Sequence, residues 1–543
     1  MYWWQGFELY LSEDEKVKQQ VFIQIKKKFG VRPVPVFKEG LNKKRNDYLK
    51  NIYTIRQFMS SSLVWDKARE IARIHGVLDV DPVINTKYKF ELEDYDVPLS
   101  QVVNVIPENR PDPNWFHANS RFPDALKYAE EQFNLGIGKY DGGETNLILA
   151  QLDTGYSDHP ELSKVKKELG YNYVNTFLDR ILSIFIGRPS KRNAKDRLRN
   201  AKPFKWASHG TSTAGVVIGV NTKNAGIVGE NKDNTDGIFP YLNLIPYRIS
   251  ETVISFNNKM AHAARQAMAD GCKVITTSHA GLLRLRSWKE AVKEAYDNGV
   301  IWVSAPGSHV KGVKRIWTYP SKFPETITTT VSTKDDEAWE KTFGGAEVDI
   351  AAPGFDMYVP FARKGRKYGY RWSEGTSFST PITAAAAIIW IAHHSDEKLN
   401  GIYREPWQRV EAFRTCLKRS ARKPDGWNTE IYGAGILDVL ALLKCELPKP
   451  EELKHASSPM DVDCDEIEKV DWDIYMINKE ITYQTCRAKL ESKGQEDDMF
   501  EKVENAVGIE AKAKLKVMTA TIGENKTEEL KRRVNEFAKD WGY

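Results

Sequence analysis

An aspartate directly follows an apolar stretch that is typical of a buried strand. Residues 147–152 read Leu-Ile-Leu-Ala-Gln-Leu, and Asp153, Thr154 and Gly155 come next. Parallel α/β sheets place functional groups where their strands end, so Asp153 is a candidate site residue. An ordinary Asp/Gly turn is the alternative for this tripeptide alone. Acid–base chemistry by two carboxylates that share a proton needs a second copy of the motif, and the sequence holds none.

A histidine opens a run of small residues, Ser-His-Gly-Thr-Ser-Thr-Ala-Gly, at 208–215. The run predicts a helix whose close packing can hold the imidazole of His209 rigidly. Imidazole has the pKa of a general base that works at neutral pH. A histidine that makes only structural hydrogen bonds is the alternative for this segment.

A serine lies in a tight turn at the predicted start of an apolar helix. Ser377 follows Gly375 and Thr376, and Pro381 precedes the apolar residues 382–390. Backbone N–H groups and the helix dipole at such an amino end favour developing negative charge, as expected for a nucleophile. A serine that only caps the helix is the alternative.

Taken together, the three segments are far more specific than any one of them. They occur in the order Asp, His, Ser, which is the chain order of one known catalytic triad. With these residues the chain resembles the subtilase family of serine peptidases. The resemblance covers about residues 115–445 and extends to further segments at 237–240, 319–321, 348–354 and 432–438.

The resemblance implies a subtilisin-like α/β fold, in which helices flank a parallel sheet, and a serine-type endopeptidase that forms an acyl-enzyme. Ser377 is the expected nucleophile, His209 the base, and Asp153 the residue that orients the imidazole. The expected partner is a protein or peptide substrate, bound in an extended form by backbone pairing. The residues that would line its binding site are Ser278, Ala280, Gly281, Ser304, Pro306 and Gly307.

One position departs from the family pattern. Ser308 stands where subtilases usually carry an asparagine that donates a hydrogen bond to the oxyanion. Loss of such a donor slows catalysis by roughly 10²–10³-fold. Ser308 is therefore a candidate oxyanion donor, beside the backbone N–H of Ser377. No cofactor is expected to be required, and calcium, which is common in the family, has little support because Glu161 replaces an aspartate.

The pattern of the chain predicts three units. Residues 1–110 form an N-terminal unit, 115–445 the catalytic domain, and 447–543 a helical extension after Pro448 and Pro450. Between 146 and 443, apolar runs alternate with amphipathic stretches, as in parallel β-α-β units. The strands expected there include 147–152, 242–249, 273–277 and 301–304, with a helix at 288–298.

The flanking units leave alternatives open. Residues 64–82 predict a helix, a glycine turn and a short strand, similar to the end of a subtilase prodomain that blocks the active site. Such a unit is either a removable inhibitor, cleaved between 92 and 125, or a stable domain. The C-terminal extension, residues 447–543, either packs on the catalytic unit as a structural support or binds a partner. The basic stretch 188–205 is either a solvated loop or a rim that attracts acidic surfaces.

Composition limits the function classes. The 543 residues exceed the roughly 250–300 of one core, and 41% hydrophobic against 28% charged residues is a folding composition. The net charge of +5 implies no drive toward nucleic acid. The start lacks the pattern of a secretory signal, and no run spans a membrane, so a cytoplasmic location is expected. The five scattered cysteines suit a reducing compartment and argue against a disulfide framework or zinc site.

Two functions therefore compete. The first is an active serine endopeptidase restrained by its N-terminal region, since all three candidate catalytic residues are present. The second is a weakly active or inactive scaffold that binds peptides on the same fold, which Ser308 and the large flanking units favour.

Overall fold

The structure is a computed structural model of the whole chain. It describes residues 3–37, 47–59, 63–84, 110–133, 148–174, 193–196, 198, 207–220, 236–240, 242–254, 258–281, 284–308, 318–363 and 367–456. The described residues fall into two compact units, of which one contains residues 3–35 and 51–84 and the other most of the remainder. Most of the predicted extension 447–543 lies outside the described residues, so that assignment stays a prediction.

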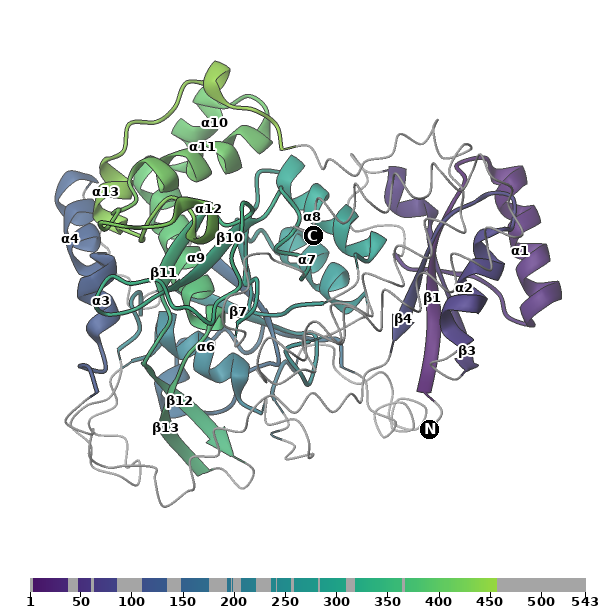
Figure 1. The fold of residues 1–543 in the computed structure, drawn as a ribbon, viewed down its shortest axis with the longest axis horizontal. Coiled ribbons are helices and arrows are strands. Elements are labelled where there is room, and N and C mark those ends of the chain that lie inside the picture. Colours follow the sequence, from purple (N-terminus) through teal and green to yellow (C-terminus); the bar gives the residue numbers. More distant parts are fainter. Residues whose placement is uncertain are drawn as a thin grey trace. The chain divides into compact units, whose positions relative to one another are not determined.

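The smaller unit is a four-stranded antiparallel sheet in the order β2-β3-β1-β4, with two helices against it (Figure 1). Its elements are β1 (Trp3–Leu11), α1 (Glu15–Phe29), β2 (Val34–Pro35), β3 (Ile52–Met59), α2 (Val64–Ala72) and β4 (Val77–Ile84). Gly76 has a φ of 90° and makes the turn between α2 and β4, as the sequence predicted.

The larger unit is built on a seven-stranded sheet in the order β11-β10-β9-β8-β5-β7-β6, in which every pair is parallel. The strands are β5 (Ile148–Asp153), β6 (Tyr171–Asn172), β7 (Asn243–Arg248), β8 (Val274–Thr277), β9 (Ile301–Ser304), β10 (Ile327–Ser332) and β11 (Ile350–Pro353). The central strands β8, β9 and β10 are buried throughout, because helices cover both faces of a parallel sheet. This confirms the predicted α/β class.

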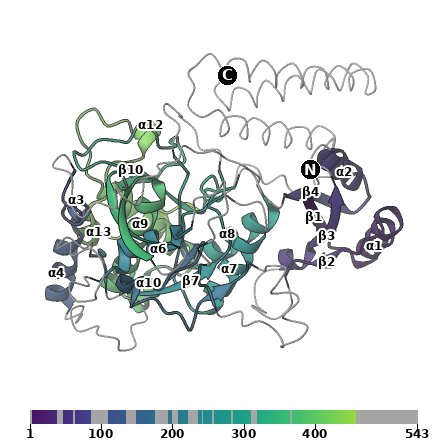
Figure 2. The same ribbon diagram turned by 90° about the horizontal axis from the view of Figure 1, so that it is seen from below.

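Helices pack on the faces of this sheet. Two of them, α6 (His209–Ile218) and α9 (Thr376–His394), contact each other, and α9 crosses β8 to β11. The pair α7 (Lys259–Ala269) and α8 (Arg286–Asp297) packs against β5 and β9, away from α9 (Figure 2).

The remaining elements complete this unit. They are α3 (Trp115–Ser120), α4 (Phe122–Phe133), the hairpin β12 (Met357–Arg363) and β13 (Lys367–Ser373), α10 (Asp396–Ile402), α11 (Pro406–Arg419), α12 (Thr429–Tyr432) and α13 (Val439–Lys444). None of the helices in the described parts of the chain is long and apolar enough to cross a membrane.

Candidate active site

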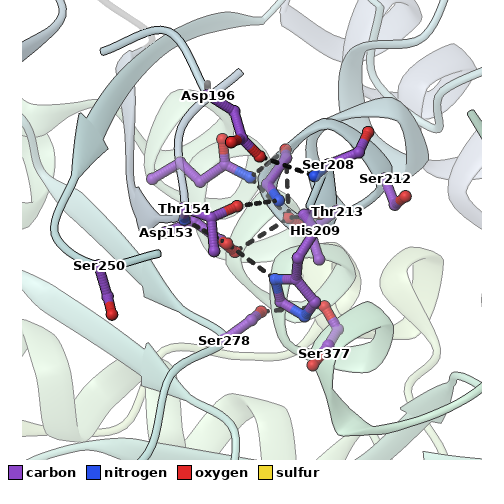
Figure 3. Close-up of polar contacts among 12 residues, drawn as sticks. Asp153, Thr154, Asp196, Ser208, His209, Ser212, Thr213, Ser250, Ser278 and Ser377 are labelled. Carbon is purple, nitrogen blue, oxygen red and sulfur yellow. Dashed lines mark hydrogen bonds and ion pairs between the residues drawn. The ribbon is translucent and has the colours of Figure 1, made fainter. Parts of the chain in front are cut away.

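A buried hydrogen bond links the end of β5 to the start of α6. Asp153 is the last residue of β5 and His209 the first of α6. Nδ1 of His209 lies 2.7 Å from Oδ1 of Asp153 (Figure 3). Burial alone would raise the pKa of Asp153, but the charge and hydrogen bond of His209 outweigh it and hold that pKa below its usual value. Since an ionised carboxylate only accepts, Nδ1 carries a proton and Nε2 is the basic nitrogen of the neutral ring.

Two polar side chains fix this pair in position. Oγ1 of Thr213, one turn into α6, lies 3.1 Å from Oδ2 of Asp153. Gln151, two residues earlier on β5, donates from Nε2 to Oγ1 of Thr213 at 2.8 Å and to the carbonyl oxygen of Gly210 at 3.0 Å. The start of α6 is therefore anchored directly on the strand that carries the carboxylate.

The residue before His209 is held by a second carboxylate. Ser208 has a φ of 71°, a left-handed conformation that costs energy for a residue other than glycine. Its N–H donates to Oδ2 of Asp196 at 2.7 Å, and its hydroxyl accepts from the N–H of Ala362 at 2.7 Å. Burial raises the pKa of Asp196. These contacts fix the direction in which α6, and with it His209, leaves the turn.

A close approach of two backbones requires the glycine of the Asp-Thr-Gly motif. Gly155 has a φ of 99°, and a Cβ there would lie 2.1 Å from the carbonyl oxygen of Ala194. Ala194 is two residues before Asp196, so this contact aligns the Asp196 segment with the end of β5. The buried Arg248 adds a hydrogen bond from Nε to the carbonyl oxygen of Thr154 at 3.0 Å.

Ser377 lies beside the imidazole, on the side away from Asp153 (Figure 3). It is the second residue of α9 and is half-buried. Its carbonyl oxygen accepts from Oγ of Ser278 at 2.9 Å. In a regular helix that carbonyl would accept from residue 381, but Pro381 has no N–H. The hydroxyl of Ser278 therefore replaces the hydrogen bond that Pro381 cannot donate. The structure thus places the three residues predicted for catalysis close together.

The first predicted substrate segment follows β8. Ala280 donates its N–H to the carbonyl oxygen of Val253 at 2.9 Å. Gly281 exchanges two backbone hydrogen bonds with Tyr319, at 2.9 and 2.8 Å. These backbone positions are therefore fixed by neighbouring segments, and Ser278 contacts the nucleophile turn itself.

The second predicted segment follows β9 and also reaches the start of α9. The N–H of Gly307 lies 3.2 Å from Oγ1 of Thr376, and the carbonyl oxygen of Pro306 accepts from Thr318 at 2.5 Å. Ser304 is fully buried and its hydroxyl bonds that of Ser321 at 3.0 Å. The neighbouring Ser308 is partly exposed, and its backbone bridges to Thr342.

Sequence reasoning missed two residues of this site. The buried His279 lies with its ring centroid 6.5 Å from that of His209, and burial lowers its pKa to about 4. Asp196 is the other. One signal was available for it, because Asp196 is the sole acidic residue in the basic stretch 188–205. Most of that stretch lies outside the described residues.

The described residues offer no set of ligands for a metal ion. No group of three or more His, Cys, Asp or Glu side chains converges among them. Glu161, which stands where the family carries an aspartate, is fully buried and accepts from the hydroxyl of Tyr370 at 2.6 Å.

Comparison with known proteins gives a consistent group of relatives. Subtilisin E of Bacillus subtilis (strain 168) is 25% identical over 301 residues, which are 55% of this chain and 65% of that protein. Thermitase of Thermoactinomyces vulgaris is 25% identical over 287 residues, or 52% of this chain and 83% of that protein. The major intracellular serine protease of Bacillus subtilis (strain 168) is 29% identical over 219 residues, which are 40% of this chain and 63% of that protein. The chain thus spans just under two thirds of the length of subtilisin E.

A sequence model of the subtilase family matches residues 144–435. The matched region begins just before β5 and contains Asp153, His209 and Ser377. It spans more than half of the 543 residues, and the parallel sheet with its flanking helices fits the same family. The chain belongs to the subtilase family.

Proposed function

We propose that this chain is a serine endopeptidase that hydrolyses peptide bonds through an acyl-enzyme. The observation that carries the proposal is the 2.7 Å contact between His209 and the buried Asp153, with Ser377 on the other side of the ring. A base held in one orientation beside a hydroxyl is the arrangement that activates a serine nucleophile.

In the first half-reaction, Oγ of Ser377 attacks the peptide carbonyl carbon while Nε2 of His209 takes the hydroxyl proton. Asp153 stabilises the resulting imidazolium, which then protonates the leaving amine. In the second half-reaction, water attacks the ester and His209 accepts a proton of the water. His209 then gives that proton to Oγ of Ser377 as the ester C–O bond breaks and the acid product leaves. The low pKa of Asp153 keeps its carboxylate ionised throughout this cycle.

The oxyanion needs donors near the amino end of α9. The backbone N–H of Ser377 supplies one, because the first N–H groups of a helix have no intrahelical partner. Ser308 is proposed as a second, since it directly follows Gly307, whose N–H lies beside Thr376. An extended peptide would bind beside Ser278, Ala280 and Gly281 on one side and Ser304, Pro306 and Gly307 on the other.

We further propose that the N-terminal region restrains the enzyme until the connecting segment is cut. The packing narrows the expected site of cleavage. Phe116 and Phe122 are fully buried in the larger unit, and the indole of Trp115 donates to the carbonyl oxygen of Asp356 at 3.1 Å. Cleavage is therefore expected ahead of Trp115, between residues 92 and 114.

The test compares the wild type with Ser377→Ala and with a matched control, Ser163→Ala, at an exposed serine. A fluorophosphonate probe should label the wild type and the control and leave Ser377→Ala unlabelled. Only the labelled chains should digest casein and lose their N-terminal region, which intact mass will reveal over time. A wild-type chain that lacks residues 1–110 is tested as well. If this shortened chain is labelled and the full chain is not, the N-terminal region shields Ser377 in the full chain.

The second candidate function is a peptide-binding scaffold, which the replacement of the usual asparagine by Ser308 favours. If the folded truncated chain is neither labelled nor active on casein, the endopeptidase proposal is wrong and the scaffold remains.

A further inference from the structure

Two cysteine thiols lie together near the end of the larger unit. Cys416 on α11 is fully buried, and Cys445, directly after α13, is partly exposed. Their sulfur atoms lie 3.8 and 3.5 Å from the same carbonyl oxygen, that of Glu446. Both are free thiols in the structure, and their sulfur atoms converge on this one acceptor.

The surroundings make the two thiols chemically unequal. The hydrogen bond from Cys416 and the guanidinium of Arg419 lower the pKa of Cys445 to about 7, against the opposing effect of burial. The same hydrogen bond and burial raise the pKa of Cys416. Arg419 is itself held by Glu452 at 2.9 Å. Because the thiolate is the reactive form, the accessible Cys445 is the thiol that attacks first and the buried Cys416 the one that follows.

We propose that Cys416 and Cys445 form a redox-active pair that hydrogen peroxide converts into an intramolecular disulfide. The Cys445 thiolate attacks one peroxide oxygen, so that an S–O bond forms, the O–O bond breaks, and hydroxide leaves to become water. The sulfur of Cys416 then attacks the sulfenic sulfur, the S–S bond forms, and the second oxygen leaves as water with the thiol proton. The two thiols lose two electrons in total, and the peroxide is reduced to two waters.

The bond would join two neighbouring elements, α11 and α13, which contact each other and also have other partners. α11 packs against α8, and α13 packs against α4 and α9. A link between residues 29 positions apart in the sequence restricts the unfolded chain, so oxidation should raise the Tm of this unit by about 5 °C.

A third thiol serves as an internal comparison. Cys272 is buried, burial raises its pKa to about 12, and its sulfur lies 3.9 Å from the hydroxyl of Tyr247. It has neither the low pKa nor the exposure of Cys445, so it should remain a thiol under conditions that oxidise the pair.

The experiment uses the full chain with Ser377→Ala, which excludes self-digestion. One equivalent of hydrogen peroxide should lower the intact mass by 2 Da, and dithiothreitol should restore it. Trypsin should then release peptides 415–418 and 445–454 as one linked species, which also separates this bond from any that involves Cys464 or Cys486. Cys445→Ser should abolish the linked species and Cys272→Ser should preserve it.

Because Cys416 is buried, Cys416→Ser is interpreted only if its circular dichroism matches that of the parent. Cys445→Ser changes a partly exposed position, where the substitution should not disturb folding. Loss of the linked species in this variant therefore tests the proposal directly. Recovery of peptides 415–418 and 445–454 as separate alkylated species after peroxide would overturn the proposal. So would irreversible gain of oxygen at Cys445 without the link, because it would mean that Cys416 cannot reach the sulfenic acid.

Discussion

The carboxylate of Asp196 accepts the backbone N–H of Ser208 at 2.7 Å, and so holds in a left-handed conformation the residue that precedes the candidate base. Asp196 does not touch the reacting atoms. It is a positioning residue, because a turn that relaxes at Ser208 changes the direction of the imidazole of His209.

Asp196→Asn should therefore lower kcat and leave KM nearly unchanged. The amide oxygen can still accept the N–H but lacks the charge, so about 1 kcal/mol is lost and kcat falls about fivefold. Steady-state kinetics on a peptide substrate measure kcat and KM separately. Asp335→Asn, at an exposed aspartate, is the control. An equal change in both variants, or a change in KM alone, would contradict the positioning role.

Ser278→Ala should also act on kcat. It removes the hydrogen bond to the carbonyl oxygen of Ser377, which Pro381 cannot replace, and a loss of about 1–1.5 kcal/mol corresponds to about five- to tenfold in rate. Adding Pro381→Ala supplies an N–H for that carbonyl and should recover part of the loss. Ser120→Ala, which removes a buried hydroxyl that donates to the carbonyl oxygen of Phe116 at 2.7 Å, is the control. If Ser120→Ala slows the enzyme as much, the bond to Ser377 has no special role.

Local patterns predicted the residues that meet at the site but not what holds them there. Asp153, His209 and Ser377 each lie where a strand or helix begins or ends, and such boundaries leave a signature in the sequence. The bond from the N–H of Ser208 to Asp196 joins residues 12 positions apart, and the bond from Ser278 to Ser377 joins residues 99 positions apart. The order β9-β8-β5-β7 likewise depends on packing between distant segments, which no periodicity encodes.

Ser308→Asn should raise kcat if Ser308 is a weak substitute for the usual donor. The longer amide side chain reaches farther than a hydroxyl, and one oxyanion donor is worth roughly 10²–10³ in kcat, so an increase of about tenfold or more is expected. KM should change little, because the group acts on the charge that develops in the transition state. Ser163→Asn is the exposed control. An unchanged or lower kcat would mean that another group already fills this position.

Buried histidines should make the larger unit sensitive to acid. Burial lowers the pKa of His159, His279 and His393 to about 4 and that of His394 to about 3. These values lie below the 6.5 of an unfolded histidine, so the unfolded chain binds protons first as the pH falls. The free energy of unfolding is therefore fully retained above pH 6.5 and declines between about pH 6.5 and 4, by up to about 1.4 kcal/mol per pH unit for each histidine.

His159 offers the sharpest test of this decline, because both of its ring nitrogens are engaged. Nδ1 accepts the N–H of Glu161 at 3.3 Å, and Nε2 lies 3.3 Å from the carbonyl oxygen of Gly369. Protonation would remove the acceptor, whereas an asparagine accepts the same N–H and does not titrate. Urea unfolding of His159→Asn in the Ser377→Ala chain should therefore give a shallower loss of stability between pH 6.5 and 4 than the parent. His75→Asn, at an exposed histidine, should leave the slope unchanged, and an equal slope in all three chains would refute the assignment of His159 to this titration.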